Sequence, residues 1–215
     1  MILQLLTLAR DIISGLAQLA AATGTLLKHF GPLRRADGRS SYENVSLSLH
    51  LKIMDRGGAR AALERRQVVR FVSTETGVIR DLVWGDGDAV RGYALSGARL
   101  IGKRAEGSTT ALLLVLPKSP AAGQRAEVRS TRLIRGALTR PQEFFEVRVE
   151  RRTERLALKV SFPKTRPPSD VWAVTDPPEA VRALPVRLGS DGRAYVQWRP
   201  ARVKVSSIYR LAWSW

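Results

Sequence analysis

From residue 42 onward, apolar and polar residues alternate in short stretches that turn-forming residues separate. In residues 45–53 (VSLSLHLKI), Val, Leu and Ile alternate with Ser, His and Lys at every position. Successive side chains of a strand point to opposite faces, so this pattern predicts a strand with one buried face. Leu49 is therefore expected to be buried, and His50 is expected to face water or a polar surface.

Similar stretches recur as far as the C-terminus. Gly57–Gly58 and residues 189–192 (GSDG) are typical of hairpin turns. Many short strands separated by turns favour a mainly β protein, specifically an antiparallel β-sandwich that is either single and large or two stacked. The predicted strands are 45–53, 63–73, 78–84, 89–95, 98–103, 110–116, 124–134, 143–151, 154–162, 170–174, 186–188, 194–196 and 207–215.

Pro and Gly cluster in residues 117–123 (PKSPAAG), which is typical of a boundary. The predicted sandwich therefore has a first half at 42–117 and a second half at 124–215. The sequence leaves open whether the halves form two sandwiches or one continuous stack.

Residues 1–30 follow a helical period instead. At 100° per residue, most of the leucines fall on one side and Gln, Thr and Ser on the other, which predicts an amphipathic helix. Gly31–Pro32 ends it, and 31–41 is a basic linker. The apolar side also repeats in heptads. The residues predicted to contact a membrane or a second copy are Leu5, Leu8, Ile12, Leu16, Leu19 and Leu26.

Three surfaces compete for this apolar stripe: the protein's own sheet, a second copy of the helix, and a membrane. Arg10–Asp11 interrupts the apolar run, so a simple transmembrane helix is marginal. A cleaved signal peptide is a further alternative, but the first nine residues carry no positive side chain. Basic residues directly after such a helix favour a cytoplasmic protein that is peripheral to or anchored in the inner membrane.

The composition is that of a folded, strongly basic protein. The 44% hydrophobic content excludes wholesale disorder, and the absence of Cys excludes disulfides, iron–sulfur clusters and thiolate zinc sites. The 36 Lys and Arg against 19 Asp and Glu give a net charge of +17, which favours an anionic partner: nucleic acid, an acidic membrane surface or an acidic protein. A GC-rich genome is the alternative explanation of the many arginines.

The densest basic run lies in residues 148–166. Glutamates are interleaved with it, so ion pairs across strands are the favoured interpretation and a nucleic-acid face is the alternative. The candidate anion contacts in the whole chain are Lys28, Arg34, Arg35, Arg151, Arg152 and Arg155.

Candidate chemistry is sparse. His29 and His50 have no spacing that pairs them as metal ligands, and no nucleophile elbow accompanies any serine. Asp81, Asp86 and Asp88 surround a turn, but they are too few for a calcium site, and backbone turn formation explains them better. The sequence therefore predicts no enzyme, no metal and no cofactor.

The last strand, 207–215 (SIYRLAWSW), has one fully apolar side. Tyr209, Leu211, Trp213 and Trp215 lie on it, which favours packing in a core. Base stacking and a membrane interface are the alternatives for these aromatic residues and Trp198.

The second half carries a family resemblance. The stretches 162–164 (FPK), 166–168 (RPP), 171–172 (VW) and 209–215 (YRLAWSW) resemble a β-sandwich module of high-GC bacteria. That module stands at the C-terminus of helix-turn-helix regulators and of proteins from conflict (defence) loci. The resemblance implies a sensing or interaction module and transfers no site residue.

The sequence thus predicts a non-enzymatic effector or sensor that self-associates or engages a membrane through its helix. The alternative is a soluble nucleic-acid-binding protein with a basic β face.

Overall fold

The structure is a computed structural model that describes residues 41–73, 77–84, 92–106, 109–177 and 181–215. The chain divides into two units, Met1–Ser40 and Ser41–Trp215, and every described residue belongs to the second. The predicted amphipathic helix lies outside the described residues, as does the linker up to residue 40.

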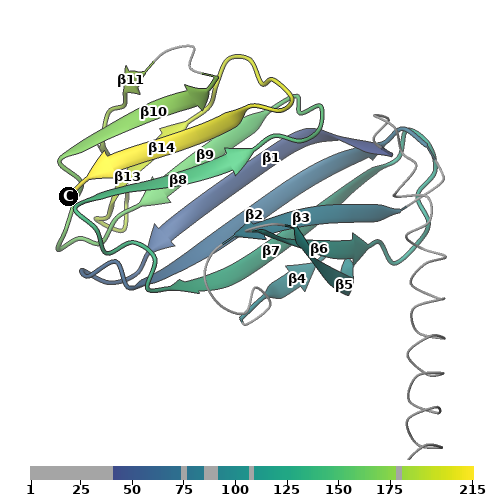
Figure 1. Cartoon of the computed structure of the whole chain (residues 1–215), viewed down its shortest axis with the longest axis horizontal. Coiled ribbons are helices and arrows are strands. Elements are labelled where there is room, and N and C mark those ends of the chain that lie inside the picture. The colour runs from purple at the N-terminus through teal and green to yellow at the C-terminus, as the bar shows by residue number, and fades with distance from the viewer. Residues whose placement is uncertain (1–40, 74–76, 85–91, 107–108, 178–180) are drawn as a thin grey trace, which may run out of the picture. The chain divides into compact units, whose positions relative to one another are not determined.

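The described part is mainly β, as the alternation predicts (Figure 1). The strands form three sheets of seven, four and three strands. The strands are β1 (Tyr42–Ile53), β2 (Arg60–Phe71), β3 (Val78–Trp84), β4 (Ala94–Ser96), β5 (Arg99–Glu106), β6 (Thr109–Val115), β7 (Arg125–Arg135), β8 (Gln142–Arg148), β9 (Leu156–Ser161), β10 (Asp170–Asp176), β11 (Arg182–Ala183), β12 (Arg187–Leu188), β13 (Ala194–Trp198) and β14 (Ile208–Ser214).

The seven-stranded sheet has the order β12-β13-β9-β1-β2-β7-β4. Its strands pair antiparallel except β1 and β9, which are parallel. The sheet contains strands from both sides of residues 117–123, so the two predicted halves share their largest sheet.

A β-bulge sets which side chains of β1 point inward. The register with β2 shifts between Asn44 and Ser46. Asn44 and Leu47 are three positions apart, so a regular strand would place them on opposite faces. The bulge adds one residue to β1, and Tyr42, Asn44 and Leu47 therefore share one face. Further along β1, Leu49 is 4% exposed, which confirms its predicted burial. His50 points to the opposite face, as expected.

The four-stranded sheet, β11-β10-β14-β8, covers one part of the inward face. Phe162, which follows β9, meets Trp213 of β14 with ring centroids 5.6 Å apart. Trp213 is 1% exposed and Tyr209 is also buried, which confirms the predicted core role of this strand. Burial of each large apolar side chain contributes about 1.5–3 kcal/mol to stability.

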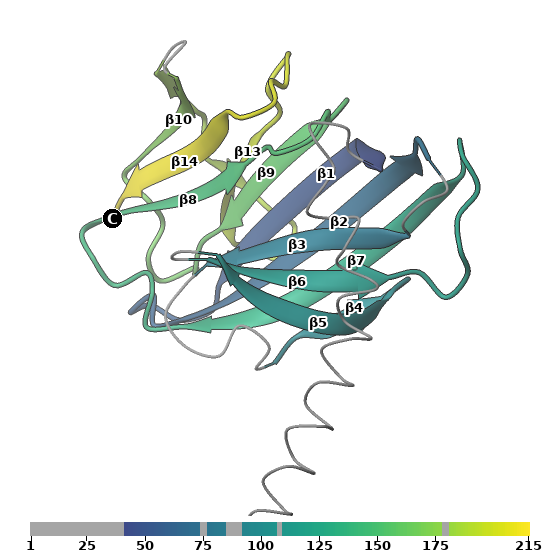
Figure 2. The same cartoon turned by 45° about the vertical axis from the view of Figure 1, so that its right-hand side comes forward.

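The three-stranded sheet, β3-β6-β5, covers a second part of the same inward face. There Val69 and Phe71 of β2 pack with Ile79 of β3 and Leu112 of β6. Both views show the two small sheets on the same side of the large one (Figure 2). The inward face of β2 therefore contributes to two separate apolar cores. Leu63 belongs to the first core, under the four-stranded sheet, and Val69 and Phe71 belong to the second, under the three-stranded sheet.

β8 and β9 belong to different sheets, so the chain crosses from the small sheet to the large one in residues 149–155. The sequence predicted a strand over most of this segment, but β8 ends at Arg148. Backbone bonds hold the crossing on β1: Asn44 N donates to Arg152 O at 2.8 Å, and Glu154 N donates to Asn44 O at 2.9 Å. This crossing segment brings charged side chains to the border between the two cores.

Candidate functional site

Polar side chains occupy inward positions of the large sheet between its two apolar cores. Arg65 and Gln67 stand on β2 between the residues of the two cores, and Ser130 and Arg132 stand at the matching place on β7. We call this polar strip the seam. Its side chains point inward because strand alternation forces them to, not because their chemistry favours burial.

The seam contains a partly open cavity of about 50 Å³, the seam pocket. A water molecule needs roughly 10–15 Å³ by this measure, so the pocket has room for a few waters or for one small oxyanion group. The charged residues that line it are Arg65, Arg80, Asp81, Arg132, Arg148, Glu150 and Arg151.

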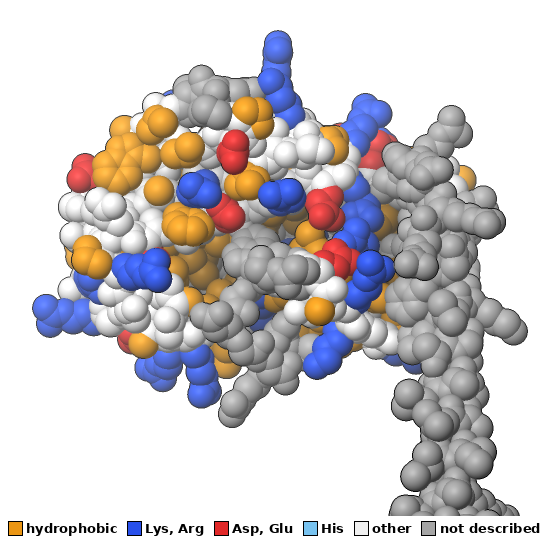
Figure 3. Space-filling view, in the orientation of Figure 1, with side chains coloured by type: hydrophobic (Ala, Val, Ile, Leu, Met, Phe, Trp, Pro, Cys, Tyr) orange, Lys and Arg blue, Asp and Glu red, His pale blue; other side chains and the backbone are white. Residues whose placement is uncertain are grey.

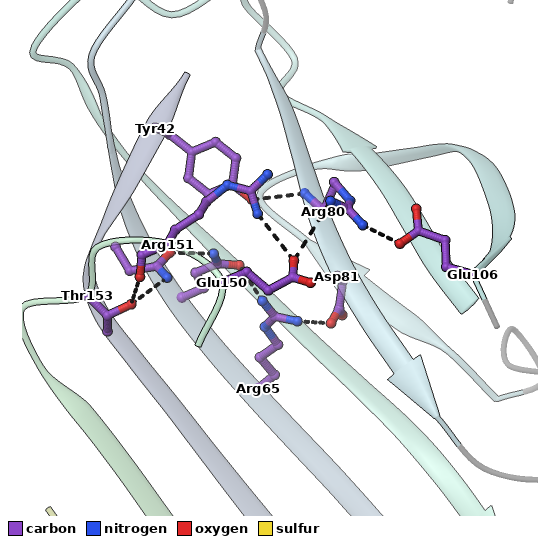
Figure 4. Close-up of polar contacts among 10 residues, drawn as sticks. Tyr42, Arg65, Arg80, Asp81, Glu106, Glu150, Arg151 and Thr153 are labelled. Carbon is purple, nitrogen blue, oxygen red and sulfur yellow. Dashed lines mark hydrogen bonds and ion pairs between the residues drawn. The ribbon is translucent and has the colours of Figure 1, made fainter. Parts of the chain in front are cut away.

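Arg65 and Asp81 form an ion pair inside the seam (Figure 4). Their side chains are only 15% and 9% exposed. The second carboxylate oxygen, Asp81 Oδ2, accepts hydrogen bonds from Tyr93 OH at 3.1 Å and from Ser130 Oγ at 3.2 Å. Both oxygens of Asp81 are therefore engaged, and the carboxylate connects β3 to β2 and β7.

Two guanidinium groups share this carboxylate environment. Burial lowers the pKa of Arg65, and burial together with the charge of Arg65 lowers the pKa of Arg132 to about 10. Both groups remain protonated at neutral pH.

The crossing segment forms the opposite wall of the pocket. Arg151 Nη1 lies 3.7 Å from Glu150 Oε2, and its guanidinium carbon lies 4.5 Å from the centroid of the Tyr42 ring. Arg80 Nη1 lies 3.8 Å from the same Glu150 oxygen, and Arg80 also pairs with Glu106. Figure 4 shows these groups converging from β1, β3 and the crossing segment.

A chain of amide and hydroxyl groups supports this wall. Gln67 Nε2 donates to Asn44 Oδ1 at 2.6 Å, and Asn44 Nδ2 donates to Thr153 Oγ1 at 2.9 Å. Thr153 Oγ1 in turn donates to Arg151 O at 2.9 Å. Arg65 Nη2 donates to Gln67 Oε1 at 3.0 Å. This series of hydrogen bonds therefore connects the side chain of Arg65 to the backbone carbonyl of Arg151. All three uncharged side chains are buried, which makes these bonds well suited to fixing one geometry.

The predicted anion contacts separate into three groups. Arg151 lines the seam pocket, whereas Arg152 and Arg155 are exposed outside it. Arg152 Nε lies 3.6 Å from Glu43 Oε2. The remaining three, Lys28, Arg34 and Arg35, lie outside the described residues, as do the six apolar contacts Leu5, Leu8, Ile12, Leu16, Leu19 and Leu26.

The interleaved glutamates pair with arginines of other strands. Arg70 Nη2 lies 2.6 Å from Glu154 Oε1, and Arg210 Nη2 lies 2.6 Å from Glu146 Oε2. Figure 3 shows acidic side chains beside basic ones at several places on one face. The arginines of these two pairs lie outside residues 148–166; within that run, Arg151 pairs with Glu150 and Arg152 with Glu43. Such pairs reduce the positive field of the surface on which they lie.

Only one of the three aspartates that the sequence placed around one turn belongs to the described residues. Asp81 is engaged with Arg65, and Asp86 and Asp88 lie outside the described residues. Among the described residues, no three His, Asp or Glu side chains form a group suited to a metal ion. In the same residues, no helix has the length and apolar character needed to span a membrane.

Arg65, Arg80 and Arg132 were not singled out from the sequence. A signal for one of them is present, since Arg65, together with Gln67, interrupts an otherwise apolar set of inward positions in 63–71. Polar residues at inward positions of a half-buried strand indicate that the layer packed against the sheet is incomplete or polar at that place. Arg80 carries no such signal because its partners come from distant segments.

No family model matches the sequence, and no curated protein matches it. Among solved structures, a variant of the M1 zinc metallopeptidase from Deinococcus radiodurans shares 9% identity with a TM-score of 0.50, covering 81% of this chain and 43% of that one. A putative protease from Parabacteroides distasonis shares 11% identity with a TM-score of 0.48, covering 83% of this chain and 41% of that one. The chain thus spans less than half the length of these structures, and at this identity the first likeness concerns the fold alone.

Proposed function

We propose that this protein is a binding module that recognises an anionic group in the seam pocket. The observation that carries the proposal is the charge of the lining, in which five arginines face two carboxylates around one small cavity of the described structure. Arg65 pairs with Asp81, and both Arg80 and Arg151 lie near Glu150, so the five arginines and two carboxylates leave an excess of positive charge in the lining. An anion that enters the pocket would offset this excess.

The chemistry of the lining fits an oxyanion group. A guanidinium presents its donors in a planar fork that matches a carboxylate or a phosphate, and charge-assisted bonds are stronger in a poorly solvated site. The cavity volume limits the bound part to one such group, so the rest of the ligand or partner remains outside. The seam pocket is therefore proposed as a recognition site for the charged end of a larger molecule or for a small free anion.

The wider role is a sensor or effector of bacterial origin, in keeping with the module that residues 143–215 resemble. In this proposal the antiparallel β-sandwich receives the anionic signal or partner. The amphipathic helix of residues 1–30 self-associates or engages an anionic inner-membrane surface. Net charge and the apolar stripe of the helix support this part, which rests on the sequence.

The test measures the thermal unfolding midpoint of the full chain in increasing inorganic phosphate and, separately, in increasing acetate, with chloride holding the ionic strength constant. A ligand that binds only the folded state at 100 times its dissociation constant adds about 2.7 kcal/mol to stability. We expect a saturating rise with at least one of the two anions. The anion that gives it distinguishes phosphate recognition from carboxylate recognition.

Arg132→Met should abolish the rise, because it removes a buried guanidinium from the pocket while keeping an unbranched side chain. Arg135→Met is the matched control, since Arg135 is exposed on the same strand and points to the other face. Equal responses of the two variants, or no response of the parent beyond that to chloride, would refute anion recognition in the seam.

A further inference from the structure

The outward face of the large sheet carries a second group of reactive side chains. His50 on β1 is paired in register with Glu64 on β2 and with Lys159 on β9. Ser161 lies two residues beyond Lys159, on the same face of β9. Adjacent strands therefore place a carboxylate, an imidazole and a hydroxyl in one row.

The distances within this row match a nucleophile with its base. His50 Nε2 lies 2.8 Å from Ser161 Oγ, and His50 Nδ1 lies 3.4 Å from Glu64 Oε2. A carboxylate beside Nδ1 favours the tautomer with its proton on Nδ1, which leaves Nε2 as the acceptor for the serine hydroxyl. The arrangement assigns the order carboxylate, imidazole, hydroxyl that serves acyl transfer in unrelated folds.

The surroundings keep the imidazole neutral. Burial, then the charge of Lys159 and then that of Lys52 lower the pKa of His50 to about 4, while Glu64 opposes the shift. Lys52 Nζ lies 2.5 Å from Glu64 Oε1, and Lys159 Nζ lies 4.6 Å from the centroid of the Tyr195 ring. At neutral pH, the imidazole of His50 is therefore uncharged.

The row lies in an open hollow of about 710 Å³ on the outward face. His50, Lys52, Lys159, Ser161, Arg193 and Tyr195 are among the residues that line it. The hollow is large enough for a small organic molecule, and Lys52 and Lys159 line it together with Ser161, which is 7% exposed. The seam pocket is on the other face of the same sheet, so this hollow is a separate site.

We propose that Ser161, His50 and Glu64 form a hydrolytic site for small carboxylic esters. Ser161 Oγ attacks the carbonyl carbon while its proton passes to His50 Nε2, and the oxygen that becomes negative lies near Lys52 and Lys159. The bond to the leaving alcohol breaks, and that alcohol takes the proton from His50. Water, deprotonated in turn by His50, then releases the carboxylic acid and restores Ser161.

The site extends beyond the proposed anion recognition and does not depend on it. The sequence favoured no enzyme because it showed no nucleophile elbow. The row is instead assembled from three strands, β1, β2 and β9. His50 and Ser161 are 111 positions apart in the sequence. An assembly of this kind has no local sequence signature.

Labelling with a fluorophosphonate tests the proposal on the full chain. The serine oxygen displaces fluoride from phosphorus, and intact-protein mass and peptide mapping then locate the adduct. We expect one adduct, at Ser161, and hydrolysis of 4-nitrophenyl acetate at a rate above that of buffer. Ser161→Ala should lose both, and His50→Gln should slow labelling by about 10²–10⁴-fold, the usual contribution of a general base.

Ser48→Ala is the matched control, because Ser48 is exposed on the same face of β1 and close in sequence to His50. It should retain full labelling and hydrolysis. Glu64→Gln provides a second variant that keeps the shape of the side chain, and it should reduce the rate without removing Ser161. Thermal unfolding confirms that each variant is folded.

The pH profile gives an independent readout. Hydrolysis should decline only as pH falls toward about 4, where His50 becomes protonated next to Glu64, Lys52 and Lys159. An adduct at another residue, no adduct at all, or unchanged labelling in folded His50→Gln would each overturn the proposal.

Discussion

Arg65 on β2 and Asp81 on β3 form an ion pair that joins the large sheet to the three-stranded sheet. The pair is largely shielded from solvent, and Arg132 lies close enough for its pKa to respond to Arg65. The Asp81 carboxylate thus compensates the charge of Arg65, which the alternation of β2 places on the inward face. Its loss would leave buried positive charge without its main counterpart.

The stability of the seam should therefore depend strongly on Asp81. Asp81→Asn is expected to lower the free energy of unfolding by about 3–5 kcal/mol, the usual effect of removing one member of a buried ion pair. Urea unfolding of the variant and the parent at pH 7 measures the difference. Combining Asp81→Asn with Arg65→Met should recover part of the loss, because the unpaired charge is then also removed. A double variant no more stable than Asp81→Asn would contradict this account.

The two sides of β1 should respond very differently to truncation. Leu49→Ala is expected to lower the free energy of unfolding by about 2–5 kcal/mol, because Leu49 is buried in the first core and the cavity left behind closes only partly. Ser48→Ala, at the exposed neighbouring position, should change stability by no more than about 0.5 kcal/mol. Urea unfolding of both variants checks the expected contrast, and similar losses would show that the strand is placed wrongly.

The lowered pKa of His50 makes stability depend on pH. Between its ordinary value of 6.5 and its folded value of about 4, the unfolded chain binds more protons at this residue than the folded chain does. Stability contributed by neutral His50 is therefore present above pH 6.5 and is lost as pH falls toward 4. The size of the loss is at most about 3 kcal/mol.

His50→Gln isolates this contribution. The drop in unfolding free energy between pH 7.5 and pH 4.5 should be smaller in the variant than in the parent by roughly 2 kcal/mol. Carboxylates titrate over the same interval in both proteins, so only the difference between the two drops is informative. An equal drop would place the folded pKa of His50 near its ordinary value.

The apolar stripe of the N-terminal segment predicts association. An isolated helix gains little from propensity alone and needs a surface for such a stripe. Ile12→Asp together with Leu19→Asp should release the protein from membranes or reduce its mass in solution, while residues 41–215 stay folded. Membrane fractionation, light scattering and circular dichroism measure these three properties. Cooperative unfolding of the double variant, with a monomeric and soluble parent, would instead make the helix part of the protein's own core.

Binding to nucleic acid should be weak and should not depend on sequence at physiological salt. Each phosphate that is neutralised releases counterions, so the affinity should fall steeply as salt rises. Fluorescence anisotropy with two unrelated DNA duplexes at several salt concentrations provides the measurement. A complex that resists salt and selects one sequence would favour the alternative of a nucleic-acid-binding protein.

Local patterns were enough to predict most strands and their buried sides. The alternation in 45–53 identifies the core face of β1, and the alternation in 207–215 identifies that of β14, because strand geometry converts spacing directly into direction. The Gly-rich hairpin at 189–192 fixes a turn by the same local reasoning. None of these predictions needs knowledge of which strands become neighbours.

The tertiary structure alone decided which side chains meet. Arg65 and Asp81 belong to different sheets, and Ser161 reaches His50 only because β9 pairs in parallel with β1. Such contacts depend on how the crossing segment and the two small sheets pack against the large sheet. That packing results from the summed burial of many side chains. The sequence by itself therefore determined the faces of the strands, whereas packing of the sheets determined the seam pocket and the row on the outward face.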